Sequence, residues 1–245
     1  MGANPIKRRI VVADDTEFWR EKILALLATT GHDVIAVGNG ATAARLCLDP
    51  ARPADLLVLD LVMPGTDGFE TARYLRSEPI TRSLPIIAIT SFFNKQDFPR
   101  GLREQGFDAI VEKTAGPDQC LFVFNKYLNP DQSKKGHAPR VPARIPTMFC
   151  DANSQRRRGL ITNLSVSGAF VSTLEPLAQT AQVQIAFELP DGTPISTTAT
   201  VVWVNDERAA ARTSYSLGNG LTFKEMSGDD SHALSRFIQQ ELLYI

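Results

Sequence analysis

Cysteine is scarce in this 245-residue chain, whose three cysteines lie far apart, at Cys47, Cys120 and Cys150. Thiols so few and so scattered exclude a disulfide framework and a cysteine-ligated zinc site. Each cysteine lies in or beside an apolar stretch. We therefore expect three buried structural thiols.

Long apolar runs and an excess of one charge are also missing. No run approaches the ~20 residues that span a bilayer, and Met1 to Arg9 lacks the apolar core of a signal peptide. Lys and Arg number 26 against 27 Asp and Glu, so the formal net charge is −1. These features indicate a cytoplasmic protein, and the lack of a helix-turn-helix pattern disfavours direct DNA binding.

Two short apolar runs end in acidic residues. Leu56–Leu59 is followed by Asp60, and Ile10–Ala13 is followed by Asp14 and Asp15. Runs of this length read as strands buried on both faces, and open α/β sheets place functional groups at the carboxyl edge of such strands. Three carboxylates brought together there need a proton or a cation, and hard oxygen ligands suit Mg²⁺.

Two further runs end in a hydroxyl and an ammonium group. Leu84–Ile89 is followed by Thr90, and Ala109–Glu112 is followed by Lys113. Taken singly, such residues are often a helix cap, a turn residue or a solvated lysine. Four successive strands that each end in a reactive or charged group rarely occur by chance, and their order indicates one shared site.

The first half of the chain resembles the response-regulator receiver domain, whose spacing is preserved at Asp14, Asp15, Asp60, Thr90 and Lys113. The resemblance implies an α/β fold with a doubly wound, flavodoxin-like parallel sheet over residues 1–128. It also implies that Asp60 is the phosphoacceptor. The partner that supplies the phosphoryl group would be a sensor histidine kinase or a phosphotransfer protein.

The same resemblance assigns roles to the neighbours of Asp60. The implied magnesium ligands are Asp15, Asp60 and the backbone carbonyl of Val62, with Asp14 acting largely through water. Lys113 would pair with the phosphoryl group. The hydroxyl of Thr90 would swing toward that group and draw its loop inward.

Three departures from the family qualify these expectations. Thr114 follows Lys113 where the family usually has proline, so we expect a differently built loop there. Ile110 stands where a Tyr or Phe rotamer switch is usual, so the output face would be read without that switch. Pro99 and Gly101 interrupt the expected fourth helix, which should be short, late-starting or kinked.

The hydrophobic period changes near residue 130. Pro117 opens an amphipathic helix that ends the first domain, and the polar residues 129–138 read as a linker. The strand-like runs of the second domain, residues 139–245, are Gln182–Leu189, Ile195–Val204 and Leu217–Phe223. They predict a small antiparallel β-barrel, followed by an amphipathic helix capped by Asp229-Asp230-Ser231.

The second half begins with a basic stretch between Asn129 and Gly168. Its cations are Lys134, Lys135, Arg140, Arg144, Arg156, Arg157 and Arg158. From Ala169 onward acidic residues predominate. Such segregation indicates either an anion site or a solvated, salt-bridged surface.

Asn163-Leu164-Ser165-Val166-Ser167-Gly168 follows the basic stretch and resembles the PilZ motif, Asp/Asn-x-Ser-x-x-Gly. The predicted barrel, Trp203 at a strand end, the Gly218–Phe223 strand and the terminal helix agree with that family. The resemblance implies binding of cyclic di-GMP. The implied ligand residues are Arg140, Arg144, Asn163, Ser165 and Gly168.

The arginine part of this motif, Arg-x-x-x-Arg, has two possible registers. Arg140 and Arg144 satisfy it literally. Alternatively, Ala138-Pro139-Arg140-Val141-Pro142 resembles the family's usual run at the second arginine, and Gly136 then stands in place of the first. The spacing to Asn163 favours this second register, in which Lys134 and Lys135 would replace the missing charge only in part.

These observations favour a two-input regulator, controlled by phosphorylation at Asp60 and by cyclic di-GMP, that acts on an unknown downstream protein. The main alternative is a phosphorylation-controlled adaptor whose barrel binds no nucleotide and docks a motility or exopolysaccharide partner directly. DNA binding is a weaker third option, for which Arg156–Arg158 is the feature to suspect, although a solvated turn is the simpler interpretation. No catalytic output domain is visible, so we expect that the protein is not an enzyme.

Overall fold

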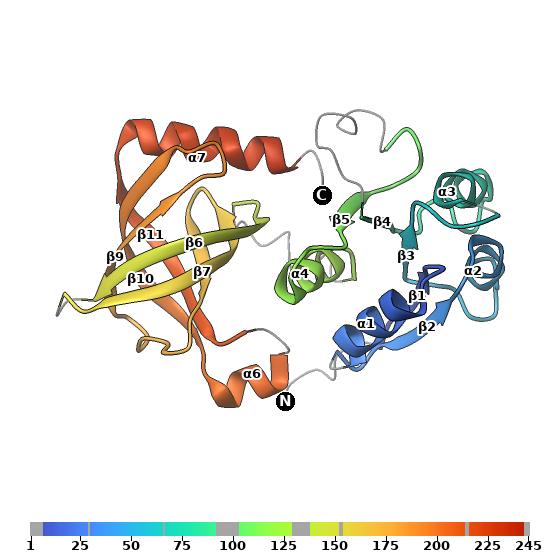
Figure 1. Cartoon of the computed structure of the whole chain (residues 1–245), viewed down its shortest axis with the longest axis horizontal. Helices are drawn as coiled ribbons and strands as arrows, with labels where there is room; N and C mark the ends of the chain where they lie inside the picture. Colours follow the sequence, from blue (N-terminus) through green and yellow to red (C-terminus); the bar gives the residue numbers. More distant parts are fainter. Residues whose placement is uncertain are drawn as a thin grey trace. The chain divides into compact units, whose positions relative to one another are not determined.

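The computed structural model describes residues 7–28, 30–65, 67–91, 103–128, 138–151, 154–213 and 216–242. The chain divides close to residue 130 into two compact units (Figure 1). The predictions made for Pro99, Gly101, Lys134, Lys135 and Gly136 lie outside the described residues. Within the described part, no helix is long and apolar enough to cross a membrane.

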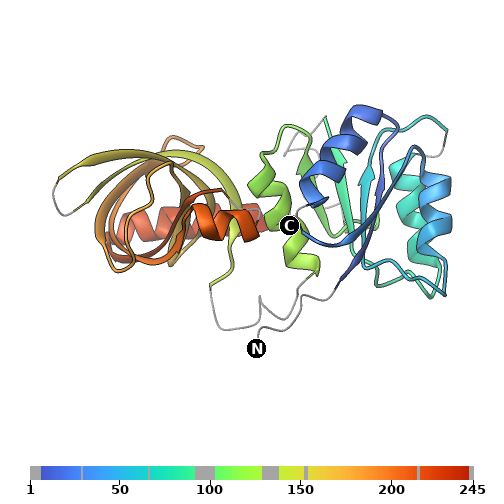
Figure 2. The same ribbon diagram turned by 90° about the horizontal axis from the view of Figure 1, so that it is seen from below.

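The first unit is an α/β layer structure with a parallel five-stranded sheet in the order β2-β1-β3-β4-β5. Its strands are β1 (Arg9–Ala13), β2 (Asp33–Val37), β3 (Leu56–Asp60), β4 (Ile86–Thr90) and β5 (Ala109–Glu112). Its helices are α1 (Glu17–Ala28), α2 (Gly40–Cys47), α3 (Gly68–Ser77) and α4 (Pro117–Leu128). Helices α1 and α4 cover one face of the sheet and α2 and α3 the other (Figures 1 and 2). The predicted doubly wound fold is therefore confirmed.

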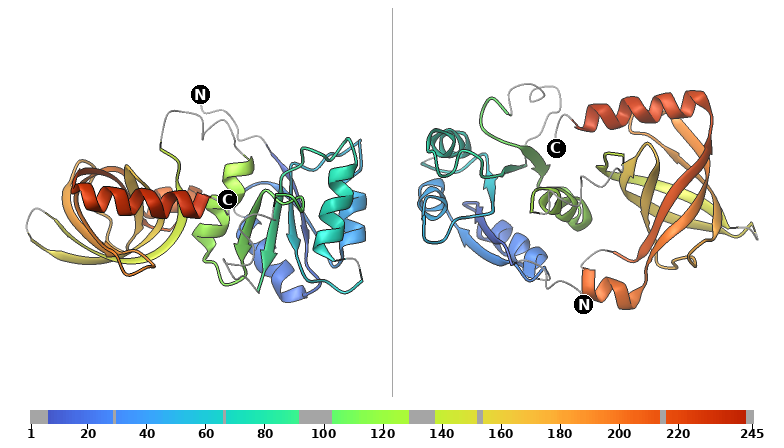
Figure 3. Two further views of the ribbon diagram at one scale, coloured as in Figure 1. Left: turned by 90° about the horizontal axis from the view of Figure 1, so that it is seen from above. Right: turned by 180° about the vertical axis from the view of Figure 1, so that it is seen from behind.

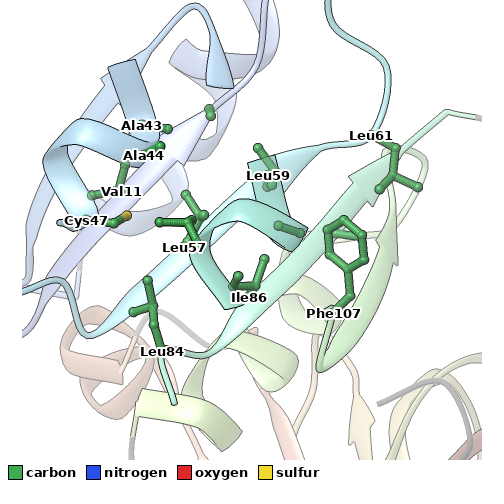
Figure 4. Close-up of a cluster of buried hydrophobic side chains, with 14 of the residues drawn as sticks. Val11, Ala43, Ala44, Cys47, Leu57, Leu59, Leu61, Leu84, Ile86 and Phe107 are labelled. Atoms are coloured by element: carbon green, nitrogen blue, oxygen red, sulfur yellow. The ribbon is translucent and has the colours of Figure 1, made fainter. Parts of the chain in front are cut away.

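The core of this unit holds the strand ends in place. Strands β1, β3 and β4 are buried along their whole length, which explains why they read as continuous apolar runs. Leu57, Leu59 and Ile86 pack with residues of α2 and with Phe107 in one apolar cluster (Figure 4). Each such side chain contributes about 1.5–3 kcal/mol when it is removed from water. The functional groups at the ends of these strands are thus held by a rigid core.

The parallel register brings those groups to one edge. Ala13 lies opposite Leu59, and Ala88 lies between Leu59 and Ile110 on the neighbouring strands. The carboxyl ends of these four strands therefore lie side by side. Asp14, Asp60, Thr90 and Lys113 are the polar residues at this edge.

The second unit is a closed antiparallel barrel in the order β10-β11-β8-β7-β6-β9 (Figure 3). Its strands are β6 (Val141–Asp151), β7 (Arg156–Ser165), β8 (Gly168–Ser172), β9 (Gln182–Glu188), β10 (Pro194–Asn205) and β11 (Gly218–Met226). The helices are α6 (Glu207–Thr213), between β10 and β11, and α7 (Gly228–Glu241), which contacts β7 and β10. Closure leaves no unpaired sheet edge. The predicted barrel with a terminal helix is confirmed.

Two local predictions are wrong. Helix α7 begins earlier than its predicted cap, because Ser227 has an extended backbone and its side chain accepts from the N–H of Asp230. Asp229 and Asp230 instead lie in the first turn, where carboxylates favour the helix dipole. Cys150 is only partly buried, whereas Cys47 and Cys120 are buried as expected. Burial raises the pKa of Cys47 to about 12 and that of Cys120 to about 11.

Arg76 on α3 ties that helix to the loops that precede β4 and β5. Its guanidinium donates to the carbonyl oxygens of Gly106 (2.9 Å) and Leu84 (2.6 Å), and it pairs with Asp108 Oδ2 at 2.7 Å. Asp108 also accepts from the N–H of Ile86, the first residue of β4, at 2.8 Å. One side chain thus fixes the entry to two strands of the site.

We predict that Arg76→Ala destabilises the first unit by about 2–3 kcal/mol, because several charge-assisted hydrogen bonds are lost and their carbonyl acceptors lie partly buried. The measurement is hydrogen exchange of the β4 and β5 amides in the full chain. Arg73→Ala, on the exposed face of the same helix, is the control and should leave exchange unchanged. Equal protection in both variants would contradict the assigned role of Arg76.

Candidate functional site

Three carboxylates meet at the carboxyl edge of the parallel sheet. Asp14, Asp15 and Asp60 each offer an oxygen, and these atoms all lie within 4.8 Å of one another. Asp14 is 2% exposed and Asp60 is 3% exposed, whereas Asp15 faces solvent. Asp14 follows β1 and Asp60 ends the neighbouring strand β3, so the sheet itself places them together.

Lys113 lies between the two buried carboxylates. Its Nζ is 2.7 Å from Asp14 Oδ2 and 2.7 Å from Asp60 Oδ2. Burial raises the pKa of Asp60, although the hydrogen bond from Lys113 opposes that rise. Burial would lower the pKa of Lys113, but the bonds to Asp14 and Asp60 outweigh it and raise this pKa. The ammonium group of Lys113 therefore stays protonated and positively charged.

The charge balance of this cluster suits a divalent cation. Three carboxylates (−3) and one ammonium (+1) leave a formal charge of −2 among the side chains in contact. Oxygen ligands from few carboxylates, with room on the exposed side at Asp15, are the set that Mg²⁺ accepts. The residues present fit the implied metal.

Val62 and Thr90 adjoin the cluster through their backbones. The Val62 N–H donates to Asp60 Oδ1 at 3.3 Å, so this peptide lies beside the carboxylate. Thr90 is buried at the end of β4, and its carbonyl accepts from the Lys113 N–H at 2.8 Å. After Lys113 the chain closes a turn in which the Ala115 N–H donates to the Glu112 carbonyl at 2.9 Å.

The departures Thr114 and Ile110 take ordinary structural roles. Thr114 joins the turn after Lys113, where its hydroxyl donates to Glu112 Oε2 at 3.0 Å, and no cis peptide bond is found among the described residues. Ile110 is 6% exposed and packs in the apolar cluster that also contains Leu59 and Phe107. An aliphatic side chain at this position has no polar group that could form a hydrogen bond in an outward rotamer, so its chemistry favours the buried one.

In the barrel, Arg140 and Asn163 are brought together. Arg140 directly precedes the first residue of β6, and its Nη1 donates a hydrogen bond to Asn163 Oδ1. Loss of water around the guanidinium lowers the pKa of Arg140. Within the described residues the only side-chain partner found for Arg140 is this neutral amide, and no carboxylate balances its charge. A partly desolvated cation without an anion is the arrangement that attracts a phosphate.

Ser165 and Gly168 form the two ends of the β7–β8 turn. They pair across the hairpin, and Ser165 Oγ donates to the Gly168 carbonyl at 3.1 Å. The turn is anchored on β11, because the N–H of Phe223 donates to the carbonyl of Ser167 at 2.9 Å. A Cβ at position 168 would lie 2.1 Å from the Leu221 carbonyl oxygen, so only glycine fits. The close approach of β11 therefore requires the glycine at the end of the motif.

Comparison with known families agrees with both halves. The model of the response regulator receiver domain matches residues 10–123, and the model of the PilZ domain matches residues 134–240. The chain is a response regulator with a PilZ output domain. The first unit is hereafter the receiver domain and the second the PilZ domain, both of which are regulatory modules.

Individual relatives match the receiver domain. Protein PilH of Pseudomonas aeruginosa is 30% identical over 120 residues, which are 49% of this chain and 97% of PilH. The polar-differentiation response regulator DivK of Brucella anthropi is 27% identical over 121 residues, 49% of this chain and 96% of DivK. Among solved structures, the chemotaxis protein CheY4 of Vibrio cholerae has 20% identity and a TM-score of 0.46, covering 50% of this chain and 99% of CheY4.

Arg144 and Arg156–Arg158 lie within strands β6 and β7. Arg144 is exposed and lies in an irregularity of β6 between Pro142 and Ile145. Arg156–Arg158 form the first part of β7 in the β6–β7 hairpin rather than a turn, although Arg156 and Arg158 are exposed to solvent, as the sequence indicated. Their exposure alternates accordingly, and the half-buried Arg157 pairs with Glu175 at 2.7 Å.

Trp203 extends the row of residues that contains Asn163. On successive strands, Trp203 lies opposite Gly220, Gly220 opposite Phe170, and Phe170 opposite Asn163. The rings of Trp203 and Phe170 are 5.3 Å apart across the bare Gly220, and the indole is 44% exposed. Sequence reasoning gave Trp203 no place in the site, because only the barrel register reveals the row.

We predict that Gly168→Ala destabilises the PilZ domain by about 1–3 kcal/mol, because the added methyl group overlaps the Leu221 carbonyl and the β7–β8 turn must leave β11. Hydrogen exchange of the β8 and β11 amides measures the effect. Gly228→Ala is the matched control, since a Cβ there meets nothing within 4 Å. Unchanged exchange in Gly168→Ala would refute the close approach.

Proposed function

We propose that this response regulator reads two phosphate-bearing signals. A histidine kinase or phosphotransfer protein phosphorylates Asp60, and the PilZ domain binds cyclic di-GMP. The two events set an interaction surface for a downstream protein. The observation that carries the proposal is the placement of Asp60, buried on its strand and in contact with Lys113 at an open acidic edge.

In the receiver domain, an Asp60 carboxylate oxygen would attack the phosphorus in line. The oxygen–phosphorus bond forms as the phosphorus–nitrogen bond of the donor phosphohistidine breaks, and the departing imidazole takes up a proton. Lys113, which already touches Asp60 Oδ2, then follows the charge to a phosphoryl oxygen. The Thr90 hydroxyl turns toward the same group. Mg²⁺ held by Asp15, Asp60 and the Val62 carbonyl, with Asp14 acting through water, would neutralise the phosphoryl oxygens.

In the PilZ domain, Arg140 would bind a phosphate of cyclic di-GMP. Its guanidinium is desolvated and held only by the neutral amide of Asn163 among the described contacts. Asn163 is then free to turn its amide toward a base edge, and Ser165 and Gly168 keep the β7–β8 turn next to it. The contact between Arg140 and Asn163 supports the register in which Arg140 is the second arginine of the motif.

We predict that Asp60→Asn abolishes labelling by a small phosphodonor such as acetyl phosphate, because an amide oxygen is a poor nucleophile for this transfer. Phosphoprotein electrophoresis or intact mass measures the acyl phosphate. Glu112→Gln changes an exposed carboxylate at the end of β5, which is separated from the Asp60 strand by β4, and should leave labelling intact. Persistent acyl phosphate in Asp60→Asn would show that another residue is the acceptor.

We predict that Arg140→Ala weakens cyclic di-GMP binding by about ten- to a hundredfold, the equivalent of roughly 1.5–3 kcal/mol for a charge-assisted contact. Arg144→Ala, four residues along the same segment, should change the affinity by less than about twofold. Isothermal titration of the full chain compares the two. Equal losses would establish the literal register, with Arg140 and Arg144 as the pair.

The adaptor function is the second candidate, and one surface favours it. Met148 and Pro146 on β6 and Arg156 and Arg158 on β7 lie exposed on adjoining strands. Met and Arg are enriched in protein interfaces, whereas Lys is depleted there. An absence of nucleotide binding, together with capture of a partner that depends on these residues, would favour this function over the first.

A further inference from the structure

Helix α1 reaches the acidic edge with two cationic side chains. Arg20 Nη1 donates to the carbonyl oxygens of Asp14 and Asp15, both at 2.9 Å, and so fixes the loop after β1. Lys22 Nζ lies 3.5 Å from the carbonyl oxygen of Lys113 and so contacts the loop after β5. The first two turns of α1 therefore hold both sides of the site.

Trp19, on the same helix, contacts Lys22 and Lys113 through its ring. Its ring centroid is 4.0 Å from Lys22 Nζ and 5.5 Å from Lys113 Nζ. The ring of Phe18 meets it edge to face, with centroids 5.4 Å apart and an interplanar angle of 77°. Two contacts thus fix the orientation of the indole, and the ammonium of Lys113 lies within the range of a cation–π interaction.

The surroundings strengthen this interaction. A cavity of about 170 Å³ lies beside Trp19 and Lys113, and its other walls include Ile23, Leu26 and Ile89. Water is sparse next to such walls, and cation–π attraction is larger where the cation is desolvated. Lys113 is itself only 6% exposed.

We propose that Trp19 is a positioning residue for Lys113 in phosphoryl transfer. A lysine stem is flexible and its ammonium is a point charge with no preferred direction. In the unphosphorylated site two carboxylates hold that charge, but the ammonium must follow the phosphoryl oxygens once Asp60 carries an acyl phosphate. The indole face limits where Lys113 Nζ can go, while Lys22 holds the Lys113 backbone and the ring. This inference rests on the proposed phosphorylation of Asp60.

The test compares Trp19→Leu, Trp19→Phe and Phe18→Leu in the full chain, with acetyl phosphate and Mg²⁺ as the phosphodonor mixture. We expect Trp19→Leu to slow acyl phosphate formation about three- to tenfold, the range of one cation–π contact. Trp19→Phe should recover most of the rate, because it keeps an aromatic face. Phe18→Leu removes only the edge-to-face contact that helps to orient the indole, so it should slow the reaction less than Trp19→Leu does.

A purely structural role would give a different order. If Trp19 only fills space, Phe and Leu would affect folding similarly, and the folded fraction of each would be labelled at the wild-type rate. Rates equal for the Trp, Phe and Leu variants would therefore overturn the inference. Absence of labelling in the wild-type chain would instead reject the proposed function, so the two failures are distinguishable.

Fluorescence supplies a readout independent of rate. Trp203→Phe leaves Trp19 as the single tryptophan, since the chain has two. Movement of the Lys113 ammonium relative to the indole should change the emission when Mg²⁺ and acetyl phosphate are added, and Asp60→Asn should remove the part due to acetyl phosphate. Emission that stays constant while Asp60 becomes labelled would show that Lys113 is not positioned by this ring.

Discussion

One shared cation makes the receiver site possible. Asp14 and Asp60 are buried next to each other, and two adjacent carboxylates without water would both repel and be desolvated. Lys113 Nζ, at 2.7 Å from each, makes the pair tolerable. Such a buried arrangement is stable only with good geometry. The parallel register of the sheet aligns the strand ends that carry Asp14, Asp60 and Lys113. The hydrogen bonds from Arg76 to the loops before β4 and β5 help to hold this alignment.

The strands and the main site residues could be predicted because their signals are local. A central parallel strand appears in the sequence as an apolar run. The residue after it lies at the carboxyl edge of the sheet, whatever the packing of the helices. That is why Asp60, Thr90 and Lys113 were identifiable without coordinates. The cap of α7 could not be predicted in this way, because Ser227, Asp229 and Asp230 all have side chains that can cap a helix. Only the extended backbone at Ser227 identifies it as the cap.

The contacts that sequence reasoning missed depend on distant register. Lys22 and Lys113 are 91 residues apart, and their contact requires the placement of α1 against the end of β5. Nothing in the local pattern distinguishes Trp19 from a core aromatic of an amphipathic helix. Likewise, the contact between Arg140 and Asn163 depends on the pairing of β6 with β7 and could not be read from the arginine spacing alone.

The two candidate sites treat an incoming phosphate in opposite ways. At the receiver edge three carboxylates outnumber the one ammonium, so a free phosphate is repelled there unless a cation offsets their charge. At the PilZ motif the Arg140 guanidinium faces a neutral amide, so an anion gains its full attraction directly. A cyclic dinucleotide therefore has no place at the acidic edge, and Arg140 offers no nucleophile for phosphoryl transfer. On the proposed function, charge balance alone keeps the two signals apart within one chain.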